Sequence, residues 1–479
     1  MKLKNIFYPV VLPCVAITAC STGKQADKKP TNPNILFILI DDMGWTDLGC
    51  YGSNYHETPH IDQLAKEGVR FTNAYAACPV CSPTRASILT GKYPATLNLT
   101  DWIPGRQSRG ARPDEKLIGP EFNHHLPLEE ITIVEKLKEK GYVTASIGKW
   151  HLGDSAYFPG QHGFDLNISG NHRGSPASYY TPFCREGTSW CTKDNELLAT
   201  KGNYLTDALT ASAIDFISDS KDTSFFLYLS FYTVHIPIQP KKELLEKYRQ
   251  KWLDRGDTTY IHTNPHYAAM IETLDNNVGR LMSALDSLQL LENTLIFLFS
   301  DNGGLSVFEG PNTPATTNIP LKAGKGHLYE GGIREPLIIY WKDRIEGGKV
   351  IDEPVISNDF FPTIMEYAGL DHQENEGKSI VPLLEGGDFY REDPLFWHYP
   401  HYSNQGGKPG SAVRQGKYKL IQFYEENSVE MYDLHLDISE KNNIAEKFPA
   451  IRDSLLVELA KLRQKTNARL PVPNPEYEK

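Results

Sequence analysis

The sequence predicts an α/β protein with a large mixed, mostly parallel sheet sandwiched by helices, and a smaller C-terminal antiparallel sheet with one helix. Over most of the chain, short continuous apolar runs alternate with amphipathic stretches, as expected for parallel strands that are buried on both faces. From about residue 385 the apolar runs become shorter and more closely spaced, which is typical of an antiparallel sheet. The predicted boundaries are 34–385 for the large domain and 386–479 for the small one.

The elements of the large domain follow in order. The run Asn34–Ile40 predicts a buried strand, and Thr58 and Pro59 predict the start of a helix that ends at Gly68. Further strands are expected at 142–147, 225–231 and 294–300, and further helices at 132–140 and 267–290. Strand and helix in repetition indicate a sheet that is covered on both faces.

The C-terminal region shows strand-like runs at 411–414, 417–424 and 430–434, and apolar residues on one face of a helix after Pro449. We interpret them as a small antiparallel sheet with one packed helix. The alternative is a peripheral extension of the main sheet.

The composition excludes two broad classes of protein. The 479 residues include 49 Lys+Arg and 60 Asp+Glu, for a formal net charge of −11, whereas nucleic-acid binders are basic. Hydrophobic residues make up 40% and charged residues 23%, which is ordinary globular usage and not that of a disordered chain.

Residues 1–19 are typical of a targeting segment. Lys2 and Lys4 precede an apolar run, and small residues lead to Cys20, as in a bacterial lipoprotein signal in which the cysteine is lipidated. The alternative is a secretory signal that is cut near Ala19. Residues 20–33 are polar and read as a tether. We therefore expect a periplasmic or surface lipoprotein of the bacterial cell envelope, held to the membrane only by the lipid on Cys20.

The cysteines divide into pairs and a remainder. Without Cys14 and Cys20, which belong to the signal, five cysteines are left. Cys184 and Cys191 flank a short loop and could pair, as could Cys50 and Cys78, and Cys81 is then left over.

Polar clusters follow the predicted strands. They are Asp41 and Asp42, Lys149 and His151, His235, and Asp301 and Asn302. Taken singly each is weak, since an Asp pair is more often a turn or a helix cap. However, the carboxyl ends of parallel strands form the ligand crevice of such a sheet, so these side chains are expected to converge. Three carboxylates with Asn302 would select a hard cation, and Ca²⁺ fits better than Mg²⁺ because it tolerates a crowded, irregular set.

The strongest motif is Cys81-Ser82-Pro83-Thr84-Arg85, which continues as Ala-Ser-Ile-Leu-Thr-Gly91. Pro83 and Gly91 suit the start and end of a helix, so Cys81 would lie just ahead of a helix N-terminus. A buried structural cysteine is the alternative. The motif resembles the signature of the type I, formylglycine-dependent sulfatases of the alkaline phosphatase superfamily.

Later blocks resemble the same family in the same order. They are 148–153, 300–304, 324–326 and 329–332, so the resemblance covers most of the chain. It implies that a maturation enzyme oxidises Cys81 to Cα-formylglycine, and that Arg85, Lys149, His151, His235 and Lys325 complete the active site. It also implies that residue 81 binds the divalent cation together with Asp41, Asp42, Asp301 and Asn302. For His235, an ordinary loop histidine is the alternative.

The chemistry of a sulfate ester suggests a role for each of these groups. One hydroxyl of the hydrated aldehyde would attack sulfur, while Lys149, Lys325 and the cation neutralise the sulfate oxygens and Arg85 holds the hydrate. His235 with Lys325 would protonate the leaving oxygen. His151 would then deprotonate the second hydroxyl, and sulfate would leave.

A sulfated glycan is the expected substrate. Asp101 and Trp102, His172 and Arg173, and His401 lie in loops that could surround the crevice. These blocks resemble those of bacterial exo-acting carbohydrate sulfatases, which implies a terminal sulfated galactose or N-acetylgalactosamine, with 4-sulfate favoured over 6-sulfate. Two alternatives remain: a phosphate or phosphonate monoester hydrolase of the same superfamily, and a catalytically dead glycan-binding lipoprotein.

Overall fold

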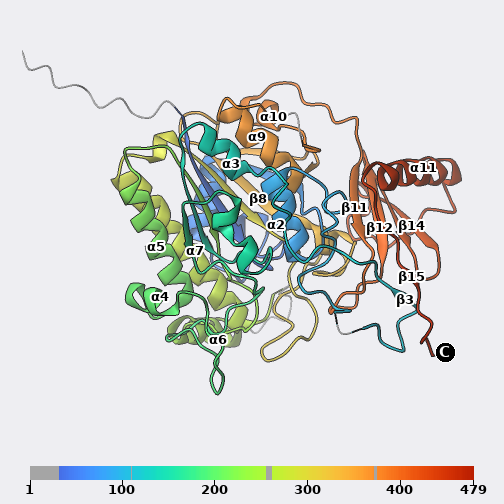
Figure 1. Ribbon diagram of the computed structural model, residues 1–479, viewed down its shortest axis with the longest axis horizontal. Coiled ribbons are helices and arrows are strands. Elements are labelled where there is room, and N and C mark those ends of the chain that lie inside the picture. Colours follow the sequence, from blue (N-terminus) through green and yellow to red (C-terminus); the bar gives the residue numbers. More distant parts are fainter. Residues whose placement is uncertain (1–31, 109, 255–261, 372–374, 479) are drawn as a thin grey trace, which may run out of the picture.

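A nine-stranded sheet forms the centre of the molecule, shown in a computed structural model that describes residues 32–108, 110–254, 262–371 and 375–478 (Figure 1). Eight of its strands lie in the order β10-β2-β8-β7-β1-β6-β4-β5, and β9 pairs with β2. The bounds are β1 Asn34–Ile40, β2 Val69–Tyr75, β4 Val143–Gly148, β5 Leu166–Ile168, β6 Phe225–Ser230, β7 Thr294–Ser300, β8 Arg334–Tyr340, β9 Lys349–Ile351 and β10 Val355–Ile356.

The sheet is mixed and mostly parallel, as predicted. Strands β7, β1, β6 and β4 are neighbours and all run parallel, so their carboxyl ends share one edge. Strand β8 is antiparallel to both β7 and β2. The four strands predicted from apolar runs are β1, β4, β6 and β7, each within one residue of its expected ends.

Helices cover both faces of the sheet. On one face, α1 (Pro59–Glu67), α5 (Leu205–Asp219) and α7 (Pro265–Ser287) pack against Leu36, Ile38 and Ile40 of β1. On the other face, α2 (Cys81–Thr90), α3 (Ile133–Glu139) and α9 (Phe360–Tyr367) pack against the alternate residues of β1. Every residue of β1 is buried, which is why the strand is a continuous apolar run. The remaining helices of this region are α4 (Asn195–Lys201), α6 (Lys242–Asp254), α8 (Glu330–Ile333) and α10 (Val381–Glu385).

The C-terminal region forms a four-stranded antiparallel sheet with α11 (Pro449–Lys465) packed on it, on the right of Figure 1. Its strands are β11 (Leu395–Tyr399), β12 (Gly410–Gln415), β13 (Tyr418–Phe423) and β14 (Ser428–Asp433). The small antiparallel sheet was predicted, but β11 was missed. A separate two-stranded sheet pairs β3 (Leu117–Ile118) with β15 (Val472–Pro473).

The small sheet packs against the segment that leads to Cys81. Trp397 of β11 is buried with Cys78 and Val80, and its indole Nε1 donates to the carbonyl of Ala76 at 2.8 Å. Lys419 of β13 is also buried, and its Nζ lies 2.9 Å from Glu330 and 3.0 Å from Glu440. These contacts connect the small sheet to the large one, and the domain boundary at 385 stays a prediction.

The cysteines differ in part from expectation. Cys184 and Cys191 form a disulfide, as one of the two suggested pairs. The Cys50–Cys78 pair is wrong, because both cysteines are free. Cys78 lies in the hydrophobic cluster that contains Trp397, whereas Cys50 packs against a different cluster, the one that contains the buried residues of α1.

Within the described residues, no helix is long and apolar enough to cross a membrane. The predicted signal, Cys20 and nearly all of the tether lie outside the described residues.

Candidate active site

The predicted polar residues meet at the carboxyl edge of the four parallel strands. Asp41 and Asp42 follow β1, Lys149 and His151 follow β4, His235 follows β6, and Asp301 and Asn302 follow β7. Cys81 and Arg85 come from the first turns of α2, and Lys325 comes from the loop between β7 and β8. The sheet topology therefore brings together residues that are up to 284 positions apart in sequence.

Carboxylates and cations alternate in this cluster. Both oxygens of Asp41 lie 2.8 Å from Lys149 Nζ, and Asp42 lies 2.7 Å from Lys325 Nζ. Arg85 Nε donates to Asp301 Oδ2 at 2.8 Å, and Arg85 Nη2 lies 2.7 Å from the same oxygen. All of these side chains are nearly inaccessible to solvent, so the interactions are little weakened by water.

The two neighbouring aspartates have opposite pKa shifts. Burial raises the pKa of Asp41 to about 8, although Lys149 opposes the shift. For Asp42 burial also favours the neutral acid, but Lys325 and His235 outweigh it and hold the pKa below its ordinary value. Asp42 has a left-handed backbone with φ of 65°, a conformation that non-glycine residues rarely adopt and that is common at functional sites.

The oxygen donors fit a hard divalent cation. Asn302 Nδ2 donates to Asp42 Oδ1 at 2.8 Å, whereas Asn302 Oδ1 is buried and has no hydrogen-bond partner among the described residues. Leaving such an acceptor unpaired costs about 1–3 kcal/mol, and a bound cation would remove that cost. Asp41, Asp42 and Asp301 provide the other oxygen donors, which together suit Ca²⁺ or Mg²⁺.

Cys81 is the first residue of α2 and is almost fully buried. Burial raises the pKa of its thiol, and the two nearby lysines only partly oppose this. A protonated thiol is a poor nucleophile. The unmodified side chain therefore lies at the centre of the site in a chemically unreactive form.

His151 is oriented to act as a base toward residue 81. Its Nε2 lies 2.6 Å from the carbonyl oxygen of Ile103, so Nε2 carries the proton, and the unprotonated Nδ1 lies 3.3 Å from Cys81 Sγ. Burial, helped by Lys149, lowers the pKa of His151 well below its usual value, so the imidazole is neutral.

His235 and Lys325 lie on the solvent side of the cluster. His235 Nδ1 lies 2.8 Å from the carbonyl of Ile236, and Nε2 lies 3.6 Å from Asp42 Oδ2. Burial, and then Lys325, lower the pKa of His235 to about 3. Contact with Asp42 raises the pKa of Lys325 against the effect of burial, so Lys325 remains a cation.

A pocket of about 310 Å³ opens above these groups. Its base includes Cys81, His151, His235 and Lys325, and the predicted substrate residues Trp102, His172 and Arg173 form part of its wall. The wall also includes Trp190, Glu309, Asn404 and Gln405, which the sequence analysis missed. Trp190 lies inside the loop that the Cys184–Cys191 disulfide closes, and the spacing of these two cysteines was the sequence feature that could have indicated an ordered loop there.

Asp101 and His401 are not part of the pocket wall. Asp101 is buried behind it and accepts hydrogen bonds from the backbone N–H of Trp102 and from Tyr399 Oη. His401 is also buried, with Nε2 2.8 Å from Thr100 Oγ1. Both side chains support the loop that carries Trp102, and their role in binding the sugar stays a prediction.

The site combines buried cationic and carboxylate side chains with a neutral histidine beneath an open pocket, an arrangement suited to the hydrolysis of anionic esters. The profile of the sulfatase family matches residues 33–370, and that of the C-terminal region of N-sulphoglucosamine sulphohydrolase matches residues 323–465. The chain belongs to the sulfatase family and is a sulfuric ester hydrolase.

Similar proteins cover nearly the whole chain. A sulfatase of Formosa agariphila is 33% identical over 91% of this chain and 88% of its own length. The N-acetylgalactosamine-6-sulfatase of Canis lupus familiaris is 32% identical over 89% of this chain and 78% of its own. The structure of Ps i-CgsB in complex with k-i-k-neocarrahexaose has a TM-score of 0.73 at 28% identity, covering 90% of this chain and 92% of its own. The phosphonate monoester hydrolase of Agrobacterium radiobacter, at 20% identity and a TM-score of 0.62 over 92% of this chain and 99% of its own, shares the fold.

Proposed function

We propose that this sulfatase removes sulfate from a terminal galactose or N-acetylgalactosamine of a glycan, using formylglycine at position 81 and a bound Ca²⁺ or Mg²⁺. The observation that carries the proposal is the position of Cys81, which lies beside the free Nδ1 of His151 and at the base of an open pocket. The sugar is supported by the printed names of relatives, which include N-acetylgalactosamine-6-sulfatase, and by the neocarrahexaose complex of Ps i-CgsB.

Formylglycine would supply a hydroxyl nucleophile on residue 81, and the cation would supply a Lewis acid that lowers the pKa of that hydroxyl. Asp41, Asp42, Asp301 and Asn302 would hold the cation. Lys149 and Lys325 supply fixed positive charge where sulfate oxygens would bind, and Arg85 orients Asp301.

Two histidines divide the proton transfers. His151 Nδ1 is free to accept a proton from a hydroxyl on residue 81, because Nε2 is held by the Ile103 carbonyl. His235 is neutral in the free protein and must gain a proton to act as an acid at the leaving oxygen. An anionic substrate would favour that protonation, and Lys325 would donate a hydrogen bond to the same oxygen.

The test of the nucleophile is mass spectrometry of the tryptic peptide Phe71–Arg85 from protein made with a formylglycine-generating enzyme. We expect an aldehyde at Cys81 and an intact thiol at Cys78, which serves as the internal control in the same peptide. Full activity with an intact thiol at Cys81 would refute the proposal.

A panel of sulfated saccharides and matched phosphate esters tests the reaction and the substrate. We expect sulfate release from a terminal 4-sulfated galactose or N-acetylgalactosamine, little turnover of phosphate esters, and little attack on the interior of a polymer. The names of the relatives favour the 6-position instead. Both isomers are therefore assayed, and preference for the 6-sulfate would overturn the positional part.

We also propose that Cys20 anchors the protein to the cell envelope through a lipid. The support is the basic, apolar and small-residue pattern that precedes it. Replacing Cys20 by serine should release the protein from the membrane fraction, and unchanged membrane association would contradict the proposal.

A further inference from the structure

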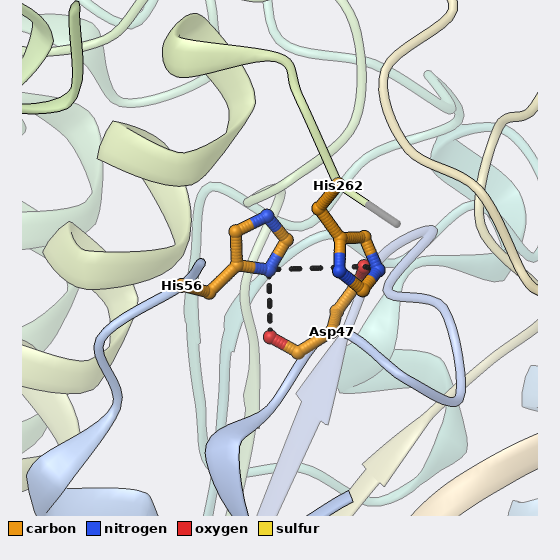
Figure 2. Close-up of side chains that lie close together, drawn as sticks. All are labelled: Asp47, His56 and His262. Atoms are coloured by element: carbon orange, nitrogen blue, oxygen red, sulfur yellow. Dashed lines mark hydrogen bonds and ion pairs between the residues drawn. The ribbon is translucent and has the colours of Figure 1, made fainter. Parts of the chain in front are cut away.

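A second group of metal-ligating side chains lies outside the active site. Asp47 follows β1, His56 precedes α1, and His262 precedes α7, and Figure 2 shows the three side chains pointing toward one another. Asp47 is fully buried, and the two histidines are 5% and 2% exposed. One ligand atom from each residue lies within 4.8 Å of the other two.

The Asp47 carboxylate lacks a fixed cationic partner. Among the described residues, its ion-pair partners are only His262 Nε2 at 3.2 Å and His56 Nδ1 at 3.8 Å from Oδ1. Its other contacts are hydrogen bonds from neutral donors, namely Gly44 N, Tyr267 Oη and Thr316 Oγ1. Burying a carboxylate without a cation costs free energy, so a bound cation would stabilise the charge of Asp47.

The donors have the chemistry of a transition-metal site. Two imidazole nitrogens and one carboxylate oxygen suit Zn²⁺, in contrast to the all-oxygen set of the active site. Zinc bonds of about 2.0–2.1 Å place tetrahedral ligand atoms about 3.3 Å apart, and the two measured separations from Asp47 Oδ1 bracket that value.

The surroundings hold the carboxylate in place. Tyr267 Oη donates to Asp47 Oδ2 at 2.6 Å, Gly44 N donates to the same oxygen at 2.7 Å, and Thr316 Oγ1 donates to Oδ1 at 2.5 Å. Such outer hydrogen bonds orient a metal ligand and leave its second lone pair available.

We propose that Asp47, His56 and His262 bind one transition-metal ion, with Zn²⁺ the best fit, distinct from the hard cation of the active site. His56 Nδ1 now lies 2.8 Å from the Asp47 carbonyl, so binding through Nδ1 requires the neutral tautomer that carries its proton on Nε2, and it leaves that carbonyl as a nearby oxygen donor. The ion would tie the loop after β1 to the start of α7. Tyr267 Oη also lies 3.4 Å from the carbonyl of Asp42, which links this site to the active-site loop.

The experiment uses the full mature chain in excess Ca²⁺, which occupies the oxygen site. The protein is titrated with Zn²⁺ and with Co²⁺, and bound metal is counted by elemental analysis. We expect one equivalent of either ion, Co²⁺ absorption bands typical of tetrahedral nitrogen and oxygen ligation, and a higher melting temperature with Zn²⁺.

Two variants assign the site. His262→Phe keeps a planar ring and removes both nitrogens, so it should lose the bound equivalent and the Zn²⁺-dependent rise in melting temperature. His266→Phe, four residues away and outside the cluster, should keep both. Unchanged zinc binding in His262→Phe would overturn the proposal.

A wild-type protein that binds no Zn²⁺ in excess Ca²⁺ would also overturn it, whether or not the variants fold. In that case the cluster is a hydrogen-bonded anchor for the loop after β1.

Discussion

Asp301 is the residue whose replacement tests the active-site geometry most directly. Its Oδ2 receives two contacts from Arg85, and its Oδ1 lies 3.3 Å from the backbone N of Asp42. Asp301→Asn keeps the shape of the side chain and removes one buried negative charge. The change therefore separates the loss of charge from the loss of packing.

The stability cost follows from the Arg85 pair. Breaking a buried ion pair costs about 3–5 kcal/mol. The Asn oxygen can still accept one hydrogen bond, and Asp41 remains 3.9 Å from Arg85, so we expect about 3 kcal/mol, near the lower end of that range. Asp215→Asn, which removes an exposed ion pair with Lys201 on the outside of α5, should cost about 0–1 kcal/mol.

Activity should fall much further than stability. Asp301→Asn would weaken the cation site and free Arg85 at once, so kcat/KM for sulfate release should fall about 1000-fold or more. Unfolding in denaturant, Ca²⁺ titration and sulfate release are measured on preparations with the same fraction of formylglycine. An Asp301→Asn protein with unchanged Ca²⁺ affinity and full activity would refute the assignment of the cation ligands.

Three further predictions concern the pocket, the small sheet and the response to acid. Trp190→Ala should lower kcat/KM on a sulfated saccharide far more than on a small aryl sulfate, because Trp190 lies in the pocket wall. The control is Trp252→Ala, at a residue that is about half exposed on α6. Equal losses of kcat/KM on both substrates would contradict the placement of Trp190 in the pocket wall. Lys419→Met should lower the free energy of unfolding by about 3–5 kcal/mol, because it leaves buried Glu330 without its lysine partner. A loss under about 1 kcal/mol would show that the Lys419–Glu330 pair does not stabilise the fold. Burial lowers the pKa of His398 to about 4 from 6.5, so the unfolded chain binds its proton first, and stability is lost as pH falls from 6.5 to 4. The loss from this residue is about 3 kcal/mol over that window, measured by denaturant unfolding, and His398→Gln should flatten the curve by that amount.

The strands and the catalytic cluster were accessible from local sequence. Strands buried on both faces must be continuously apolar, so β1, β4, β6 and β7 could be located within a residue of their ends. Polar residues that directly follow such strands have few other places to lie than the carboxyl edge of the sheet. Strand β11 was missed although Asp393 and Pro394, a turn signal, directly precede its run Leu395–Tyr399.

Side-chain direction and long-range packing were decided only in three dimensions. Asp101 and His401 occupy loops near the pocket, yet both turn inward to hydrogen-bond partners, and sequence spacing does not encode the direction of a loop side chain. Cys50 and Cys78 pack in different hydrophobic clusters, which no count of cysteines reveals.

The sequence by itself determined the fold class, the family signature around Cys81 and the residues that meet at the edge of the sheet. These follow from local apolar patterning and from the rule that parallel strands share a direction. Only the tertiary structure decided the wall of the pocket, the pairing of cysteines and the cluster of Asp47, His56 and His262. These depend on how loops from distant parts of the chain pack together, because contacts between such loops leave no periodic trace in the sequence.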